Sequence, residues 1–82
     1  MFILVSIIER DIQVSAFATF LEAQEQMIPE LKECLYPDVM SKEDCQHIDF
    51  SKNYEGDMFS CYADAAYIRG SYTTCDWSII NL

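Results

Sequence analysis

The chain has 82 residues, of which 51% are hydrophobic, and it carries 14 acidic against five basic side chains for a net charge of −9. That length allows one small domain, and the hydrophobic fraction argues against intrinsic disorder. The acidic balance argues against binding to nucleic-acid phosphates or to anionic membranes through the usual cationic contacts. We therefore expect a single domain over residues 1–82 that is attracted to basic protein surfaces.

Two strands are predicted at the start of the chain. The segment Phe2–Glu9 is short and rich in β-branched residues, which predicts a strand covered on both faces. Arg10 and Asp11 supply a turn, and Ile12–Ala16 alternates apolar and polar side chains, which predicts a half-buried strand. The apolar start lacks a basic region and a cleavage site, so we expect no signal peptide, a cytoplasmic location and reduced cysteines.

A helix is predicted from Thr19 to Leu35. Thr19 and Glu22 match a capping box, in which each side chain accepts a hydrogen bond from the other residue's backbone N–H. Pro29 removes one bond from the helical ladder, so we expect one kinked helix, with a break into two helices as the alternative. Apolar residues recur on one stripe of this helix: Phe20, Ala23, Met27, Leu31 and Cys34 or Leu35.

The second half of the chain predicts a long connection and two further strands. Residues 38–57 show little apolar periodicity, although Ser41 and Asp44 match the cap of a helical turn. Such a long connection is typical of a functional or mobile loop. Two strands follow, Met58–Ile68 and Tyr72–Ile80, with Gly70 between them for a turn of positive φ and Trp77 as the largest core residue. The predicted fold is an α+β domain of ββαββ order, with a four-stranded antiparallel sheet packed on one helix.

Four cysteines and one histidine are numerous enough for a zinc site. Their spacing does not match one, because only Cys45 and His47 form a close pair and the other cysteines lie 11 to 16 residues apart. We favour reduced, mostly buried cysteines and keep a Cys/His metal-binding protein as an alternative. A cysteine nucleophile activated by His47 has no third group to orient it, and two glycines cannot form a phosphate-binding loop. We therefore expect no enzyme and no cofactor.

The distribution of charge is the remaining clue to function. Carboxylates spaced along a helix and a loop can imitate a phosphate backbone and occupy a cationic protein groove. The alternative interpretation is an ordinary solvated face. The candidate partner-binding residues are Glu22, Glu25, Glu30, Glu33, Glu43, Asp44 and Asp49.

Three segments, Phe17–Met27, Ser60–Ile68 and Cys75–Ile80, resemble a recurrent pattern in small proteins of phages and other mobile elements. The shared features are an opening strand pair, a T-F-x-E-A helix start and a terminal D-W-x-I strand. Several small acidic proteins of this kind are anti-CRISPR proteins. The resemblance implies an inhibitor that binds a CRISPR-Cas effector in a bacterial host cell and blocks its nucleic-acid site. Its motifs are structural and transfer no inhibitory residue. The alternative is a structural or regulatory protein-binding module that forms a homodimer through a sheet edge or an apolar patch.

Overall fold

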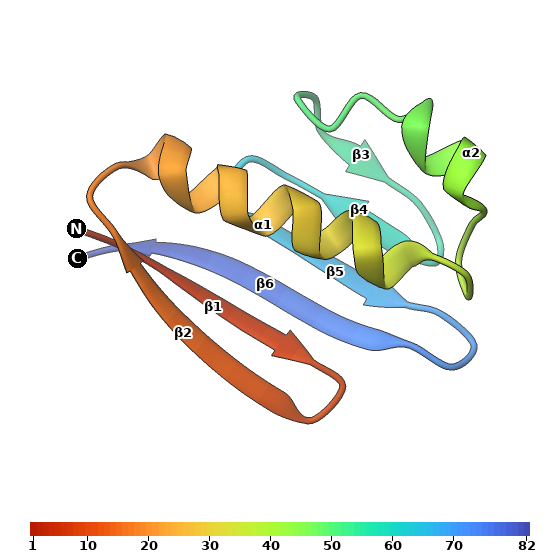
Figure 1. The fold of residues 1–82 in the computed structure, drawn as a ribbon, viewed down its shortest axis with the longest axis horizontal. Coiled ribbons are helices and arrows are strands. Elements are labelled where there is room, and N and C mark those ends of the chain that lie inside the picture. The colour runs from red at the N-terminus through yellow and green to blue at the C-terminus, as the bar shows by residue number, and fades with distance from the viewer.

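A computed structural model describes residues 1–82 as one twisted antiparallel sheet with a long helix packed across one face (Figure 1). The strands lie in the spatial order β2-β1-β6-β5-β4-β3, so the first and last strands of the chain are neighbours inside the sheet. The α+β class is therefore confirmed. In chain order the elements are β1 (Phe2–Ile8), β2 (Asp11–Phe17), α1 (Phe20–Leu35), α2 (Lys42–Gln46), β3 (Tyr54–Glu55), β4 (Phe59–Cys61), β5 (Ala65–Arg69) and β6 (Thr74–Asn81).

The start of α1 has the predicted cap. The Thr19 hydroxyl accepts from the backbone N–H of Glu22 at 3.1 Å, and the Glu22 carboxylate accepts from the backbone N–H of Thr19 at 3.2 Å. This reciprocal pair satisfies two N–H groups that the first turn would leave without partners. The capping box fixes where the chain turns from β2 into the helix.

Helix α1 continues through Pro29, so the alternative of two separate helices is wrong. Pro29 is exposed on the side of the helix away from the sheet, where water can satisfy the carbonyl that loses its partner. The predicted apolar stripe faces the sheet. Its fully buried members are Ala23, Met27, Leu31 and Leu35, with Phe20 and Cys34 partly buried beside them.

The core lies between α1 and the middle of the sheet. Trp77 is 1% exposed and is the largest fully buried side chain, as predicted. It shares its face of β6 with Cys75 and Ile79, because side chains alternate along a strand and all three are buried. This sandwich of helix and sheet positions the surfaces described below.

The sheet has six strands, and the prediction of four is wrong. The predicted strand Met58–Ile68 is two strands, because the chain turns between them and the backbone N–H of Tyr62 donates to the carbonyl of Ala65 at 2.7 Å. The connection of residues 38–57 also contains structure, the short helix α2 and strand β3. The order is therefore ββααββββ rather than ββαββ. Apolar periodicity cannot reveal elements this short, because a strand of two or three residues offers at most one alternation.

Gly70 does not adopt the predicted positive φ. It is required instead by a close approach, since a Cβ at this position would collide with the carboxylate of Asp38. That carboxylate accepts from the backbone N–H groups of Tyr72 and Thr73 at 2.8 and 2.9 Å. Asp38 therefore fastens the β5–β6 turn to the end of the helical layer.

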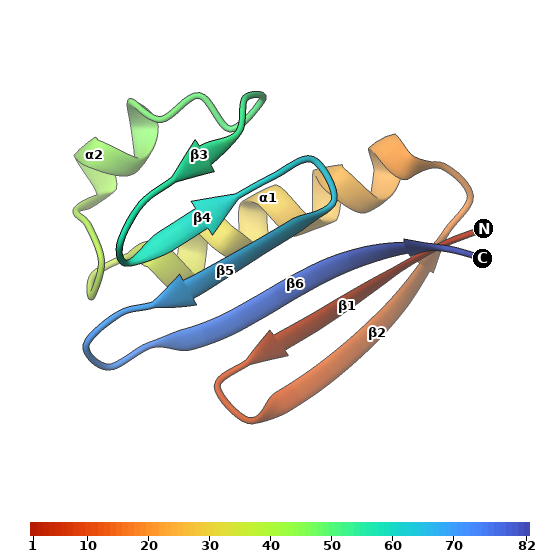
Figure 2. The same cartoon turned by 180° about the vertical axis from the view of Figure 1, so that it is seen from behind.

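The face of the sheet opposite α1 is not covered by any element (Figure 2). The apolar side chains of β1 on this side are therefore only half-buried, which corrects the prediction of a strand covered on both faces. The strand predicted over residues 12–16 is present within β2, but its predicted half-burial is wrong, because every residue from Asp11 to Ala16 is exposed. Paired residues of antiparallel strands share a face. The register thus gathers an apolar patch on the open side: Ile3, Val5 and Ile7 of β1, Ile12, Val14 and Ala16 of β2, and Ile80 of β6.

Candidate functional site

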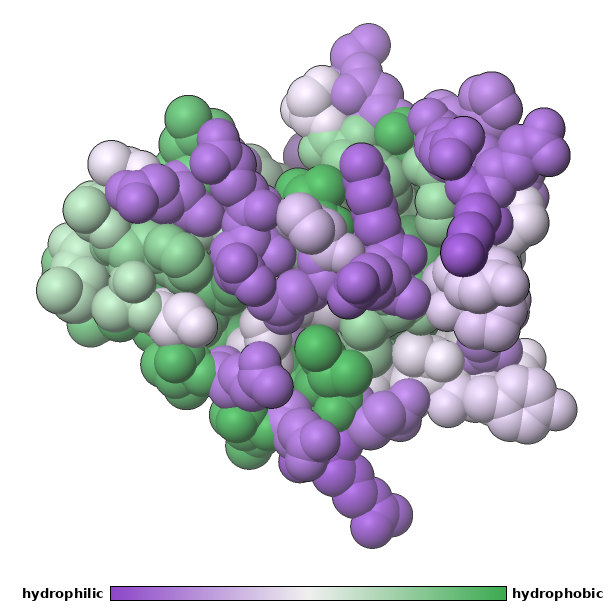
Figure 3. Space-filling view, viewed as in Figure 1, coloured by the Kyte–Doolittle hydropathy of each residue, from purple (hydrophilic) through white to green (hydrophobic).

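The outer surface of α1 carries the longest row of carboxylates. Glu22, Glu25 and Glu33 are exposed there, on the side of the helix turned away from the sheet. We call these three residues the acidic face. Hydrophilic side chains dominate the surface over α1 and α2 in Figure 3. Neither of the two ion pairs in the structure involves the acidic face.

Two of the predicted partner-binding acids have structural tasks inside the fold. Glu22 closes the capping box of α1. Glu30 is half-buried, and its carboxylate accepts from the indole N–H of Trp77 at 3.2 Å and from the side-chain amide of Gln26 at 2.6 Å. Sequence spacing alone could not show this, because Glu30 and Trp77 lie 47 positions apart in the chain.

The other predicted acids lie on α2 and the loop after it. Glu43 and Asp44 occupy the first turn of α2. The Ser41 hydroxyl caps this turn by accepting a hydrogen bond from the backbone N–H of Asp44 at 3.2 Å. Asp49 accepts from the backbone N–H of Ser51 at 3.0 Å, and hydrogen bonds from Ser51 lower the pKa of the Asp49 carboxyl. Asp49 therefore stabilises the turn that it forms with Ser51.

Two lysines lie between the acidic face and the acids of α2. The Lys32 ammonium stands 5.1 Å from the centre of the Phe50 ring, and the Lys42 ammonium stands 5.0 Å from the centre of the Tyr36 ring. Both lysines and Glu33 line a cavity of about 330 Å³ between the end of α1 and α2. The seven predicted acids thus form two groups with cations between them, rather than one continuous acidic surface.

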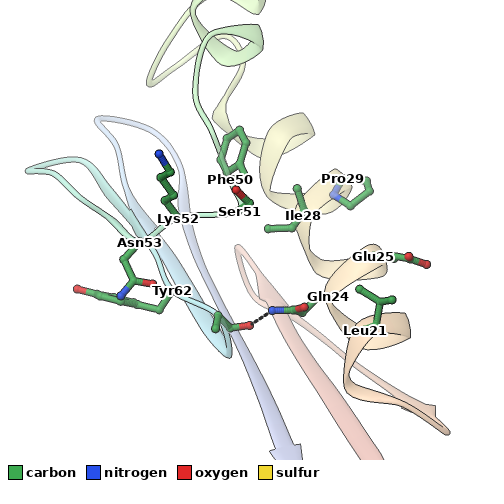
Figure 4. Close-up of a pocket in the computed structure, with 11 residues that line it drawn as sticks. Leu21, Gln24, Glu25, Ile28, Pro29, Phe50, Ser51, Lys52, Asn53 and Tyr62 are labelled. Carbon is green, nitrogen blue, oxygen red and sulfur yellow. Dashed lines mark hydrogen bonds between the residues drawn. The ribbon is translucent and has the colours of Figure 1, made fainter.

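A groove of about 500 Å³ runs beside the acidic face (Figure 4). Glu25 belongs to its wall, and the Glu25 carboxylate points away from residues 50–53 across the groove. The amide of Gln24 donates to the carbonyl of Ala63 at 2.8 Å and ties α1 to the β4–β5 turn at the groove. The apolar lining is contributed by Leu21, Ile28 and Pro29 of α1 and by Phe50 of the connection.

Sequence reasoning missed this groove. Its one available signal was Phe50, one of the two aromatic residues in the connection of residues 38–57, beside Tyr54. Residues 51–53 complete the wall opposite α1, with Lys52 pointing along it. The groove exists only because the connection folds back against α1.

The cysteines are free thiols with no activating group. Cys45, Cys61 and Cys75 are buried and Cys34 is half-buried. Burial raises the pKa of the Cys34 thiol to about 12, and it also raises the pKa of the other three thiols. The protonated thiol is a poor nucleophile and a poor metal ligand. No three His, Cys, Asp or Glu side chains converge in a geometry that could hold a metal ion.

The fold and this surface define a small acidic α+β domain with an acidic helix, an adjoining groove and an open sheet face. No family model, curated protein or solved structure matches the chain. None of the helices is long and apolar enough to cross a membrane.

Proposed function

We propose that this chain acts by binding another protein, as a stoichiometric inhibitor of the anti-CRISPR type that competes with nucleic acid for a basic surface of a CRISPR-Cas effector. The observation that carries the proposal is the acidic face. Its residues Glu25 and Glu33 are exposed and have no cation within ion-pair distance in their own chain. They are free to pair with the cations of a partner.

The charge density of α1 suits this role. The span from Glu22 to Glu33 covers about 16 Å of helix at the usual rise per residue. Four carboxylates lie along it when Glu30 is counted. One strand of a DNA duplex carries about one charge per 3.4 Å of axis, or roughly five over the same length. A groove that holds phosphates would therefore meet a comparable charge on this helix.

The groove beside Glu25 adds a contact that charge alone does not provide. An apolar side chain of the partner that enters between Leu21, Ile28 and Phe50 would be shielded from water next to the ion pairs. The proposed partner surface thus combines arginine or lysine with a neighbouring apolar residue. Binding of this kind requires no catalytic group, and an inhibitor of this type would act in the cytoplasm of a bacterial host cell.

The test is a double charge reversal, Glu25→Lys with Glu33→Lys. Both residues are exposed and make no side-chain hydrogen bond, so the domain should stay folded. We expect binding to the effector to weaken at least tenfold, with a flatter dependence of affinity on salt. The affinity is measured by titration against candidate CRISPR-Cas effectors with and without their nucleic acid.

The matched control is Asp11→Lys with Asp57→Lys, which makes the same change in net charge at two exposed acids outside α1. If the control pair weakens binding as much as the α1 pair does, the chain is attracted by its net charge and the acidic face is not the contact. If neither pair changes the affinity, the electrostatic mechanism is wrong.

A further inference from the structure

Strand β2 forms a free edge of the sheet that nothing in the chain protects. It has seven residues, whereas β3 at the opposite edge has two. Natural edge strands avoid pairing with other chains by means of lysine, proline, bulges or short length. β2 contains no lysine or proline, and its register with β1 is continuous from Asp11 to Phe17 without a bulge. The edge is therefore open to another strand.

The hydrogen bonds of β1 show which backbone groups of β2 point outward. Glu9 N–H donates to the carbonyl of Thr74 and Leu82 N–H donates to the carbonyl of Met1, so the odd-numbered residues of β1 face β6. Because the two sides alternate along an antiparallel strand, the even-numbered residues of β1 face β2, and the register pairs them with odd-numbered residues there. The N–H and C=O groups of the even-numbered residues Ile12, Val14 and Ala16 therefore point away from the sheet.

The open face of β2 carries apolar side chains, where a strand exposed to water usually carries polar ones. Ile12 and Val14 are 67% and 63% exposed on the open face, where an antiparallel sheet normally carries polar residues. Gln13 and Ser15 point to the side of α1 but are also exposed. An edge with unpaired backbone and uncovered apolar side chains is suited to pairing with another strand.

We propose that β2 pairs with β2 of a second copy of this chain, antiparallel across a two-fold axis at Val14, so that two six-stranded sheets become continuous. This register overlaps all seven residues of both strands. It places Val14 opposite Val14 and Ile12 opposite Ala16 as hydrogen-bonded pairs, which exchange about six backbone bonds. Gln13 then lies opposite Ser15.

The proposed register also keeps like charges apart within the paired strands. Asp11 is its one charged residue, and it lies opposite Phe17 of the second copy. The two Asp11 residues are separated by about 20 Å along the paired strands. That distance exceeds the Debye length of about 8 Å at physiological salt. Within the paired strands no acidic side chain therefore lies opposite another, and repulsion between the two copies comes from charges outside β2.

The size of the junction sets the strength of the dimer. Seven paired residues span about 24 Å. A contact of this size belongs with transient interfaces, which bury less than about 1,200 Å². We therefore expect a dissociation constant in the micromolar range or weaker, so that dimerisation depends on protein concentration.

The first test follows backbone amide hydrogen exchange in the wild-type chain by NMR, between about 10 µM and about 1 mM protein, on either side of the affinity expected for a transient interface. We expect Ile12, Val14 and Ala16 amides to become protected as concentration rises. The Gln13 and Ser15 amides point to β1 and are the internal control, because they are protected at every concentration. Unchanged exchange at the three outward amides would overturn the proposal.

A second test separates edge pairing from packing of the open faces. Val14→Lys places two ammonium groups against each other at the two-fold axis. Ile80→Lys puts the same charge on the same face, but β6 is an inner strand. By analytical ultracentrifugation we expect the first variant to be monomeric and the second to dimerise like the wild type. If Ile80→Lys abolishes the dimer and Val14→Lys does not, the sheets pack face to face and edge pairing is wrong.

The response to salt distinguishes this dimer from the complex of the proposed function. The dimer proposal does not depend on that function. Each copy carries −9, so raising salt from 0.1 M to 1 M, which shortens the Debye length from about 10 Å to about 3 Å, should increase the dimer fraction. Binding of the acidic face to a basic partner should weaken over the same range. A dimer that dissociates in high salt would contradict pairing through this uncharged edge.

Discussion

At the scale of single residues, the acidic side chains of this protein divide into those that hold the fold and those that are free. Glu30 bonds to Trp77, and Asp38 bonds to the β5–β6 turn. The side chains of Glu25 and Glu33 make no hydrogen bond and no ion pair in their own chain. The distinction matters for experiments, because a charge reversal at Glu30 would disturb the core and the surface together.

We predict that Glu30→Ala lowers the free energy of unfolding by about 1–2 kcal/mol, because it leaves the indole N–H of Trp77 without its acceptor. Urea unfolding followed by the fluorescence of the single tryptophan measures it. Glu30→Gln keeps an acceptor oxygen and should recover most of the loss. Glu33→Ala, on the exposed side of the same helix, should change the stability by less than about 0.5 kcal/mol. Equal losses at both positions would show that the Trp77 contact adds no stability.

At the scale of secondary-structure elements, residues close together in the sequence determine α1, whereas they do not determine how the strands around it are buried. The capping box joins residues three positions apart, and the apolar stripe repeats every three or four residues. Both can therefore be recognised in the sequence, and both are present in the structure. β2 shows the opposite case. Its alternation of apolar and polar residues predicts a buried apolar side, but the fold places α1 on the other face and leaves Ile12 and Val14 exposed.

For the cap of α1 we expect Thr19→Ala to lower the free energy of unfolding by about 1 kcal/mol, the usual contribution of an N-cap hydroxyl. Thr19→Ser retains the oxygen that accepts from Glu22 and is the matched control. Thermal or denaturant unfolding gives both values. The cap contributes nothing measurable if alanine and serine have the same stability.

At the scale of the whole molecule, the excess of carboxylates sets how stability responds to salt. The structure has two ion pairs, Lys52 with Asp49 and Arg69 with Asp76, and both are exposed. Exposed pairs contribute at most about 1 kcal/mol each, so little attraction is lost when they are screened. The repulsion among 14 acidic groups is screened at the same time.

We therefore predict that NaCl raises the melting temperature, by a few degrees up to about 0.5 M, because self-repulsion destabilises the compact state. Circular dichroism against temperature measures the shift at a protein concentration low enough to keep the chain monomeric. The Glu25→Lys, Glu33→Lys variant carries a smaller net charge and should gain less from salt. A melting temperature that falls with NaCl would mean that the two ion pairs outweigh the repulsion.

The sequence by itself determined what depends on neighbours along the chain. It was sufficient for the α+β class, the hairpin at the start, the limits and cap of α1, and the burial of Trp77. These features follow from local hydrogen bonds and from the periods of strand and helix, which short stretches of sequence encode.

Only the tertiary structure decided which strands adjoin, which sheet face stays open and which acids are free. The β1–β6 pairing brings the two ends of the chain together, and Glu30 meets Trp77 across 47 positions in sequence. The groove beside Glu25 likewise forms between residues 21–29 of α1 and residues that follow them by more than twenty positions. Such contacts depend on how distant parts of the chain pack together, so they cannot be predicted from periodicity and spacing along the sequence.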